Sequence, residues 1–329
     1  MRAAHLDTRI CSPEVELVPN RRGYGEGLLE AGKRDARIVA LAADLTESTQ
    51  THMFAEAFPD RFVQCGVAEQ NMASVASGMA AMGKIPFIAS YAMFSPGRSW
   101  EQIRTTIAYN DVNVKIIGAH AGVSVGPDGA THQAIEDIAI MRVIPNMVVI
   151  APADVHEARK AVLAAAQYEG PVYIRLARAP SPVVTTPESP FVIGKAEYCF
   201  EAAGAPEQTV GLVTTGTLLH HGLEAAEALQ QSGYGVLLLH MPTVKPLDTE
   251  ALLALSERCV GLVTIEEHQQ AGGLGSAVAE FLSAARPTLI IPVGVADQFG
   301  QSGDPEELIT HYHLDTPAIE MAAKRVLGG

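Results

Sequence analysis

Cysteine is scarce in this chain and follows no pattern. The four cysteines, Cys11, Cys65, Cys199 and Cys259, are far apart, with no Cys-x-x-Cys pair and no histidine at metal-ligand spacing. Structural zinc sites and disulfide frameworks both depend on clustered or regularly spaced cysteines. The sequence therefore predicts neither a zinc site nor a disulfide-stabilised fold.

Long hydrophobic runs and an excess of basic residues are also missing. No apolar run approaches the roughly 18–20 residues that span a bilayer. Met1–Pro19 contains charged residues but no hydrophobic segment of the signal-peptide kind. The 23 Lys and Arg residues are outnumbered by 37 Asp and Glu residues, a net charge of −14, which argues against nucleic acid and anionic membranes as bulk partners. We therefore expect a soluble cytoplasmic protein.

Hydrophobic residues are abundant and occur in short runs separated by longer amphipathic stretches. The 329 residues correspond to about two domains, and 48% of them are hydrophobic. Near-continuous apolar strands are typical of parallel sheets covered by helices on both faces. The predicted strands are Ile38–Ala43, Val114–Gly118, Met147–Ala151, Val210–Thr214, Gly235–Leu239, Gly261–Ile265 and Thr288–Pro292, and the predicted helices include Asn71–Met82, Ser99–Tyr109 and Val155–Tyr168.

The two halves of the chain meet at a proline-rich segment. Ala179–Pro190 contains four prolines and little periodicity, which is typical of a linker. We therefore predict an α/β protein with two open, mostly parallel-sheet domains. The first covers residues 14–180, the linker residues 181–207, and the second residues 208–329.

Four loops of the first predicted domain follow strands and contain polar residues. They are Asp44–Ser48, Gly66–Asn71, Ala89–Gly97 and His120–His132. In open α/β sheets, ligands bind beyond the carboxyl ends of the strands. The loops are therefore predicted to converge on one edge of the sheet, as in any protein of this fold class.

Two motifs carry a resemblance to a known family. Val63–Met72 reads VQCGVAEQNM, and Gly126–Gln133 reads GPDGATHQ. Together they resemble the pyrimidine-binding domain of transketolase, a thiamin diphosphate enzyme, and the resemblance extends over residues 14–325. The Gly-Asp-Gly and Asn-Asn signature with which that family holds Mg²⁺ and diphosphate does not occur in this sequence. The resemblance therefore implies half of an enzyme.

The resemblance assigns activation of the cofactor to Glu69. A carboxylic acid at this position in the family donates a proton to a ring nitrogen of the aminopyrimidine, and the resulting imino group takes the proton from the thiazolium carbon. Such an acid must keep its proton near neutral pH, which requires burial beside an apolar ring. The alternative is a structural glutamate in the first turn of a helix, favoured there by the helix dipole.

Further residues match cofactor positions of the family. Phe94 matches an aromatic ring that stacks on the pyrimidine, and Tyr91 replaces a phenylalanine. Asp44 and Leu45 match a segment that reaches the thiazolium end of the cofactor. The alternatives are core packing for the aromatic rings and a helix N-cap for Asp44. A third family aromatic is absent, and Ser95–Arg98 stands there instead.

A second group matches the positions that bind the terminal phosphate of a sugar in transketolases. Two guanidinium groups, a hydroxyl and an imidazole form a donor-only site for a tetrahedral anion. Asp128 is expected to accept a hydrogen bond from a substrate hydroxyl, and His132 to face the reacting carbon. The expected catalytic residues are Glu69, His132 and His120, and the alternatives are solvated arginines and a buried structural histidine. The expected substrate-binding residues are Arg21, Ser48, His120, Asp128 and Arg178.

The second half of the chain resembles the C-terminal domain of the same family, through Glu266–His268 and Gly272–Val278. The Gly-Gly-Leu-Gly segment lacks the spacing and the acidic residue of a dinucleotide-binding loop. The resemblance implies a mainly structural domain that contributes to the dimer, with His268 at a domain boundary and without a catalytic role. His220–His221 and His311–His313 have no carboxylate or cysteine at ligand spacing, so we predict that they are surface residues and that the chain itself binds no metal.

These matches predict the carboxy-terminal subunit of a two-component transketolase. The reaction is transfer of a two-carbon ketol unit from a ketose, expected to be phosphorylated, to an aldose, as in the pentose phosphate part of carbohydrate metabolism. The resemblance implies thiamin diphosphate shared with a separate N-terminal subunit, which would also hold Mg²⁺ or Ca²⁺. It further implies self-association into an α₂β₂ heterotetramer.

Three alternatives stay open from the sequence: a deoxyxylulose-phosphate synthase-like enzyme, the beta-type subunit of a 2-oxoacid dehydrogenase, and a non-catalytic scaffolding subunit. His120–Gly122 and Asp128–Gln133 favour the sugar-handling branch. The presence of Glu69 and Phe94 argues against a scaffold.

Overall fold

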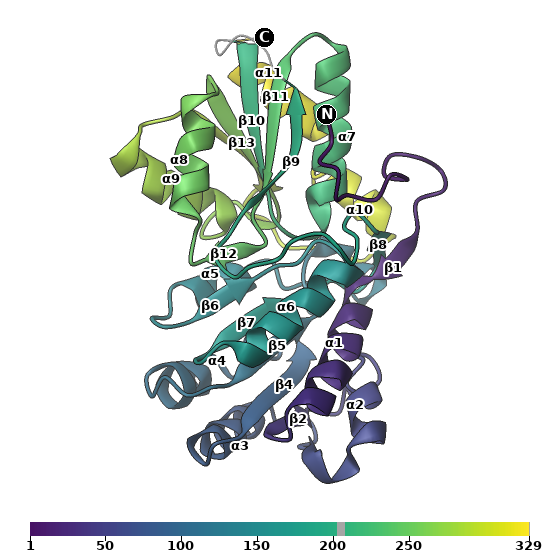
Figure 1. Cartoon of the computed structure of the whole chain (residues 1–329), viewed down its shortest axis with the longest axis vertical. Helices are drawn as coiled ribbons and strands as arrows, with labels where there is room; N and C mark the ends of the chain where they lie inside the picture. The colour runs from purple at the N-terminus through teal and green to yellow at the C-terminus, as the bar shows by residue number, and fades with distance from the viewer. Residues whose placement is uncertain (203–207, 329) are drawn as a thin grey trace.

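The strands form at the short apolar runs of the sequence (Figure 1). A computed structural model describes residues 1–202 and 208–328, so the end of the expected linker, residues 203–207, and Gly329 lie outside the described residues. The strands are β1 (Leu17–Pro19), β2 (Ile38–Ala42), β3 (Phe62–Gln64), β4 (Ile85–Tyr91), β5 (Lys115–Ala119), β6 (Val148–Ile150), β7 (Val172–Arg175), β8 (Pro180–Pro182), β9 (Glu197–Ala202), β10 (Thr209–Thr214), β11 (Gly235–His240), β12 (Thr243–Lys245), β13 (Gly261–Gln269) and β14 (Ile290–Val295).

Two large sheets, one in each half of the molecule, contain most of these strands, and β1 and β8 form a separate antiparallel pair (Figure 1). Within the described residues, the larger sheet has the order β12-β6-β7-β5-β4-β2-β3 and the smaller the order β14-β13-β10-β11-β9. Within these two sheets, neighbouring strands run parallel, except for β12 beside β6 and β9 beside β11. The prediction of an α/β protein with two mostly parallel sheets is confirmed.

Helices cover both faces of each sheet, because the strands are apolar on both sides. In the larger sheet, α1 and α6 share one buried cluster with the strands, and α3 and α5 share another on the opposite face. The smaller sheet has α7 and α11 on one face and α8 and α9 on the other. The helices are α1 (Asn20–Arg34), α2 (His52–Ala57), α3 (Glu69–Ala81), α4 (Trp100–Gln102) followed by a π-helical segment (Ile103–Ala108), α5 (Asp137–Arg142), α6 (Val155–Gln167), α7 (Leu219–Gln231), α8 (Thr249–Glu257), α9 (Leu274–Ala285), α10 (Pro305–His311) and α11 (Thr316–Val326).

The packing of α1 against α6 fixes the start of α1, which carries Arg21. A Cβ atom at Gly23 would lie 2.0 Å from the backbone oxygen of Val155, so only glycine permits this close approach. At the start of α6, the Asp154 carboxylate accepts a hydrogen bond from the Glu157 backbone N–H at 3.0 Å and caps the helix. Arg21 lies in the first turn of α1.

Two short strands depart from the expected division of the chain. Glu197–Ala202 lies within the predicted linker but forms β9, because Cys199 and Phe200 are buried in the core of the smaller sheet. Thr243–Lys245 belongs to the second half of the chain but pairs as β12 with β6 of the larger sheet, with Val244 buried in that core. One strand of the second half is therefore part of the sheet of the first half.

The strand order places the candidate loops together. β3, β2, β4 and β5 are consecutive, parallel neighbours, so their carboxyl ends lie along one edge of the larger sheet. The polar loops that follow these strands therefore meet, as the sequence pattern predicts. In the ranges 1–202 and 208–328, no helix is both long and apolar enough to cross a membrane.

Candidate active site

Glu69 is the first residue of α3 and is almost completely buried, with 3% of its surface exposed. Both of its carboxylate oxygens lie 3.4 Å from Nη1 of Arg98, whose side chain is half exposed. The Arg98 guanidinium also lies over the Phe94 ring, 4.2 Å from its centroid. A carboxylate, a cation and an aromatic ring thus meet at one point, and Arg98 is the member that the sequence pattern did not single out.

Aromatic and imidazole rings form a continuous stack beside this point. The Tyr91 ring is nearly parallel to that of His120, with 3.8 Å between centroids. Phe94 stacks against Tyr91 at 5.8 Å and meets His132 edge-on at 5.3 Å. The structure therefore brings together four residues from two loops that are predicted to face cofactor and substrate.

Arg21 reaches this stack from α1. Its Nη1 donates a hydrogen bond to the Ser48 backbone oxygen at 2.8 Å and lies 3.3 Å from Nε2 of His120. Its buried Nε has no hydrogen-bond partner within the described part of the chain. Burial, and then the nearby charge of Arg178, lower the pKa of Arg21. A buried guanidinium with a free donor is the feature expected of an anion site.

His120 is a neutral donor in this arrangement. Burial, together with the positive charges of Arg21 and Arg178, lowers its pKa to about 3. Because Arg21 donates to Nε2, the ring proton belongs on Nδ1. This nitrogen is buried and has no hydrogen-bond partner among residues 1–202 and 208–328. His120 therefore offers a second free donor beside that of Arg21.

Asp128 and Arg178 complete the polar side of the site. The Arg178 guanidinium lies 3.9 Å from the Asp128 carboxylate and donates a hydrogen bond to the Val125 backbone oxygen at 3.2 Å. Nδ1 of His132 lies 2.9 Å from the Thr131 hydroxyl. Two arginines thus face one small region of a chain whose net charge is −14, and they form a local positive site.

Two candidate residues have unusual backbone conformations. Asp44 has φ +60° and His120 has φ +54°, in the left-handed region that residues other than glycine rarely adopt. Such conformations cluster at functional sites. Asp44 is exposed and its backbone N–H donates to the Gln64 side chain. The N-cap of the next helix, α2, is Thr51, so Asp44 is not the helix N-cap of the alternative interpretation. Among the described residues, no hydrogen bond or ring contact joins Asp44 or Leu45 to the stacked rings.

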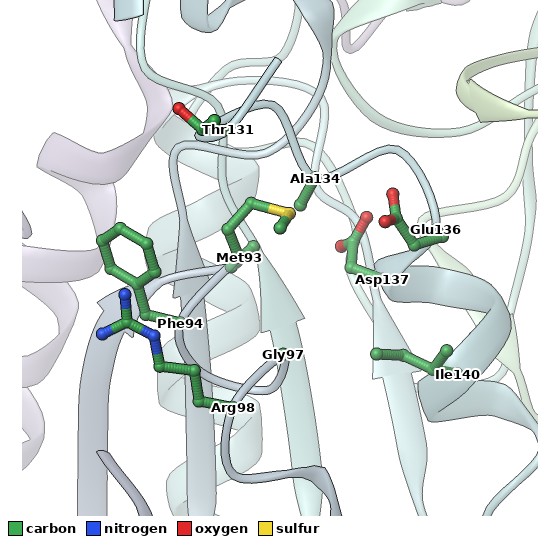
Figure 2. A pocket seen from close by; sticks show the side chains of 10 residues that line it. Met93, Phe94, Gly97, Arg98, Thr131, Ala134, Glu136, Asp137 and Ile140 are labelled. Carbon is green, nitrogen blue, oxygen red and sulfur yellow. The ribbon is translucent and has the colours of Figure 1, made fainter. Parts of the chain in front are cut away.

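A cavity of about 440 Å³ lies next to Phe94 (Figure 2). Phe94 and Arg98 lie on one side, Met93 points between the walls, and Glu136 and Asp137 lie on the other side. Phe94 and Arg98, which line this cavity, also contact the stacked rings and the buried Glu69 carboxyl group. In the part of the chain that the structure describes, no group of three or more His, Cys, Asp or Glu side chains could hold a metal ion.

The histidine pair His220–His221 is not on the surface as predicted. Both residues are half-buried on α7, and their rings lie 3.9 Å apart. They are partly covered because the apolar residues of α7 pack into the core of the smaller sheet. The side chain of His221 contacts the Thr316 hydroxyl at 3.0 Å. His311 and His313 are exposed, as expected. His268 is fully buried at the boundary between the halves and accepts a hydrogen bond from the Ala139 backbone N–H at 3.3 Å.

Family models match both halves of the chain. Residues 17–182 match "Transketolase, pyrimidine binding domain", and residues 204–319 match "Transketolase, C-terminal domain". The two matches together cover most of the chain.

Similar proteins include components of divided transketolases. The chain is 39% identical over 315 residues to the 6-deoxy-6-sulfo-D-fructose transketolase subunit SqwH of Clostridium sp., covering 95% of this chain and 96% of that protein. It is 34% identical over 304 residues to a subunit of the apulose-4-phosphate transketolase of Phocaeicola vulgatus, covering 92% and 96%. A solved structure described as a split gene transketolase, inactive beta4 tetramer, superposes with a TM-score of 0.87 at 42% identity, covering 94% of this chain and 99% of that one.

Proposed function

This chain belongs to the transketolase family, and we propose that it is the carboxy-terminal subunit of a two-component transketolase. The enzyme transfers a two-carbon ketol unit from a ketose to an aldose. One observation carries the site assignment. Glu69, the arginines Arg21 and Arg98, and four stacked rings meet at one edge of the larger sheet; the rings are those of Tyr91, Phe94, His120 and His132. Relatives of nearly the same length are themselves transketolase subunits, which supports a divided enzyme.

The cofactor of the family is thiamin diphosphate, which supplies a carbon nucleophile and then stores the electrons of the broken carbon–carbon bond. The proposed task of Glu69 is to hold and move a proton at its carboxyl group, which burial keeps away from water. Phe94 and Tyr91 offer ring faces and exclude solvent, and Asp44 and Leu45 lie on the loop proposed to reach the far end of the cofactor. His132 is proposed to face the reacting carbon.

A separate N-terminal subunit is proposed to complete the site. The chain contains no Gly-Asp-Gly and Asn-Asn signature, so the diphosphate and its Mg²⁺ or Ca²⁺ are assigned to that subunit. Two complete sites between two kinds of subunit need two copies of each, which gives the proposed α₂β₂ assembly.

We expect the two subunits to form an α₂β₂ heterotetramer in solution. Light scattering of the purified mixture measures its mass, with each subunit alone as the control. A mixture that stays a one-to-one heterodimer at assay concentration would contradict this stoichiometry, although not the division of the active site.

The substrate is proposed to be a ketose with a terminal anion. Arg21, Arg178 and the free Nδ1–H of His120 present donors, and His120 stays neutral between pH 5 and 8 because its pKa is lowered to about 3. Phosphate and sulfonate both offer the tetrahedral oxygens that such donors recognise. Ser48 lies on the adjoining loop, where its backbone oxygen orients Arg21. Asp128 is proposed to accept a hydrogen bond from a sugar hydroxyl.

Replacing Arg21 by Gln tests the function on the substrate side. Loss of hydrogen bonds from a charged donor costs about 1.5–3 kcal/mol, which corresponds to roughly a 10–150-fold lower kcat/KM for a phosphorylated ketose. The same variant should change kcat/KM for an unphosphorylated ketose by less than about threefold, because that substrate makes no such contact.

The neighbouring Arg22→Gln is the matched control. Arg22 is exposed on the same helix and pairs only with Glu26 among the described residues, so its removal should leave both substrates unaffected. Equal losses on both ketoses with Arg21→Gln, or no loss on either, would refute the assignment of Arg21 to the anion.

The decarboxylating enzymes and the scaffold gain no comparable support. Relatives that match this chain over nearly their whole length are transketolase subunits, and Glu69 and the stacked rings keep the chemistry that a scaffold has no need for. Transfer of a ketol unit is therefore the function that the site supports best.

A further inference from the structure

Two adjacent glutamates on β13 point to opposite sides of the smaller sheet. Glu266 accepts hydrogen bonds from the Leu274 and Gly275 backbone N–H groups, at 2.6 and 2.8 Å, and so holds the start of α9 within the second half of the chain. Glu267 turns the other way, because side chains alternate along a strand. It crosses the boundary into the first half, although both residues are equally buried.

Glu267 binds the loop that carries the candidate substrate residues. We call residues 120–132 the substrate loop. Oε1 of Glu267 accepts a hydrogen bond from the Ser124 backbone N–H at 2.6 Å, and Oε2 lies 3.4 Å from the Thr217 hydroxyl. Ser124 lies between His120 and Asp128, and its neighbour Val125 accepts from Arg178. The carboxylate therefore holds the centre of the loop on whose ends the candidate residues lie.

The surroundings of Glu267 keep it in place. Nη2 of Arg175 donates to the Glu267 backbone oxygen at 2.7 Å, and the Arg175 guanidinium is in turn paired with the buried Asp137 at 3.0 Å. Gln133, directly after the substrate loop, donates from Nε2 to the backbone oxygens of Val123, in the loop, and Gln301, each at 2.9 Å. The second half of the chain thus holds the loop at two independent points.

The loop backbone is shaped to receive the carboxylate. Gly122 has φ +89°, a conformation that favours glycine, and a Cβ atom there would lie 2.2 Å from Oε1 of Glu267. A side chain at Gly122 would therefore displace the Glu267 carboxylate from its position.

We propose that Glu267 is a positioning residue for substrate binding, which holds the substrate loop so that His120, Asp128 and Arg178 keep their places around the terminal anion of the ketose. This rests on the function proposed above. The C-terminal domain then contributes to substrate recognition through the backbone of another domain, and it is not only a structural support. Glu267 itself touches neither substrate nor cofactor.

The test compares Glu267→Ala, Glu267→Gln and Glu266→Ala in the complex reconstituted from both subunits. Glu267→Ala should raise KM for a phosphorylated ketose about tenfold or more, the scale of losing one hydrogen bond to a charged group. Its affinity for thiamin diphosphate should stay within about threefold of wild type, because Glu69 and Phe94 lie outside the substrate loop. Glu267→Gln should restore KM to within about threefold, since its amide oxygen still accepts from Ser124.

Glu266→Ala is the matched control for burial and strand position. It should lower the melting temperature while leaving KM unchanged. Hydrogen–deuterium exchange of the full-length chain gives a readout that is independent of activity, because the Ser124 amide is bonded to the Glu267 carboxylate. Exchange in the peptide that contains Ser124 should be faster in Glu267→Ala and unchanged in Glu266→Ala. If Glu267→Ala does not fold, Gly122→Ala separates the same two groups and should raise KM in the same way.

A folded Glu267→Ala complex with KM within about twofold of wild type would overturn the proposal, as would unchanged exchange at Ser124. If the wild-type mixture transfers no ketol unit but the exchange still responds to Glu267, the proposed function fails and the attachment of the loop stands. The two ideas therefore fail separately.

Discussion

Replacing Glu69 by Gln should lower ketol transfer by about 10²–10⁴, the usual contribution of a positioned acid–base group. The amide keeps the size and the hydrogen-bonding capacity of the carboxyl group but cannot pass a proton. Proton–deuterium exchange at the reactive carbon of bound thiamin diphosphate should fall to its uncatalysed rate. This exchange is measured by NMR in the reconstituted complex, beside the rate of ketol transfer.

If Glu69 has only a structural role, Glu69→Gln should leave ketol transfer and exchange at nearly their wild-type rates. Its effect on stability is expected to be small in either case. Its one side-chain partner in the described structure is the half-exposed Arg98 at 3.4 Å, and such a pair contributes about 1 kcal/mol or less to stability. Glu69→Gln should therefore leave the melting temperature nearly unchanged. Glu56→Gln, at an exposed position on α2, controls for a general effect of charge removal. Exchange and turnover within a few-fold of wild type would show that Glu69 is not the activating acid.

The fold is largely predictable because its strands are short apolar runs with clear local periodicity. The carboxyl ends of parallel strands always lie at the same edge of a sheet. The shared edge of the loops after β2, β3, β4 and β5 could therefore be predicted without knowing the order of the strands. The candidate site residues came from motif positions, and the structure brings most of them together around Tyr91 and His120. Their roles stay predictions.

What the sequence did not reveal depends on contacts between distant segments. Glu267 and Ser124 are 143 residues apart, and nothing in the local pattern of Glu266–His268 shows which glutamate faces the substrate loop. The pairing of β12 with the larger sheet is equally non-local. The sequence analysis placed His220 and His221 on the surface because the two residues are not hydrophobic. The hydrophobic residues around them in α7 are buried, and the pair is half-buried with them.

Arg98 was missed for a different reason. The sequence does differ from the family pattern here, because Ser95–Arg98 stands where the family has a third aromatic ring. That difference indicates a changed edge of the cofactor pocket, but it does not show what Arg98 contacts. Arg98 contacts Glu69 and Phe94 because the fold places the start of α3 beside the loop after β4, which lies far from it in the sequence. Arg98 thus joins the Glu69 carboxyl group to the Phe94 ring.

Ketol transfer by this chain, by its N-terminal partner and by their mixture tests the central claim most directly. The assay contains thiamin diphosphate, Mg²⁺, a phosphorylated ketose and an aldose. Because the diphosphate signature is absent from this chain, we expect no transfer by either subunit alone, only weak cofactor binding by this chain in a calorimetric titration, and transfer by the mixture. Transfer or submicromolar cofactor binding by this chain alone, or an inactive mixture of folded subunits, would contradict a catalytic site divided between two chains.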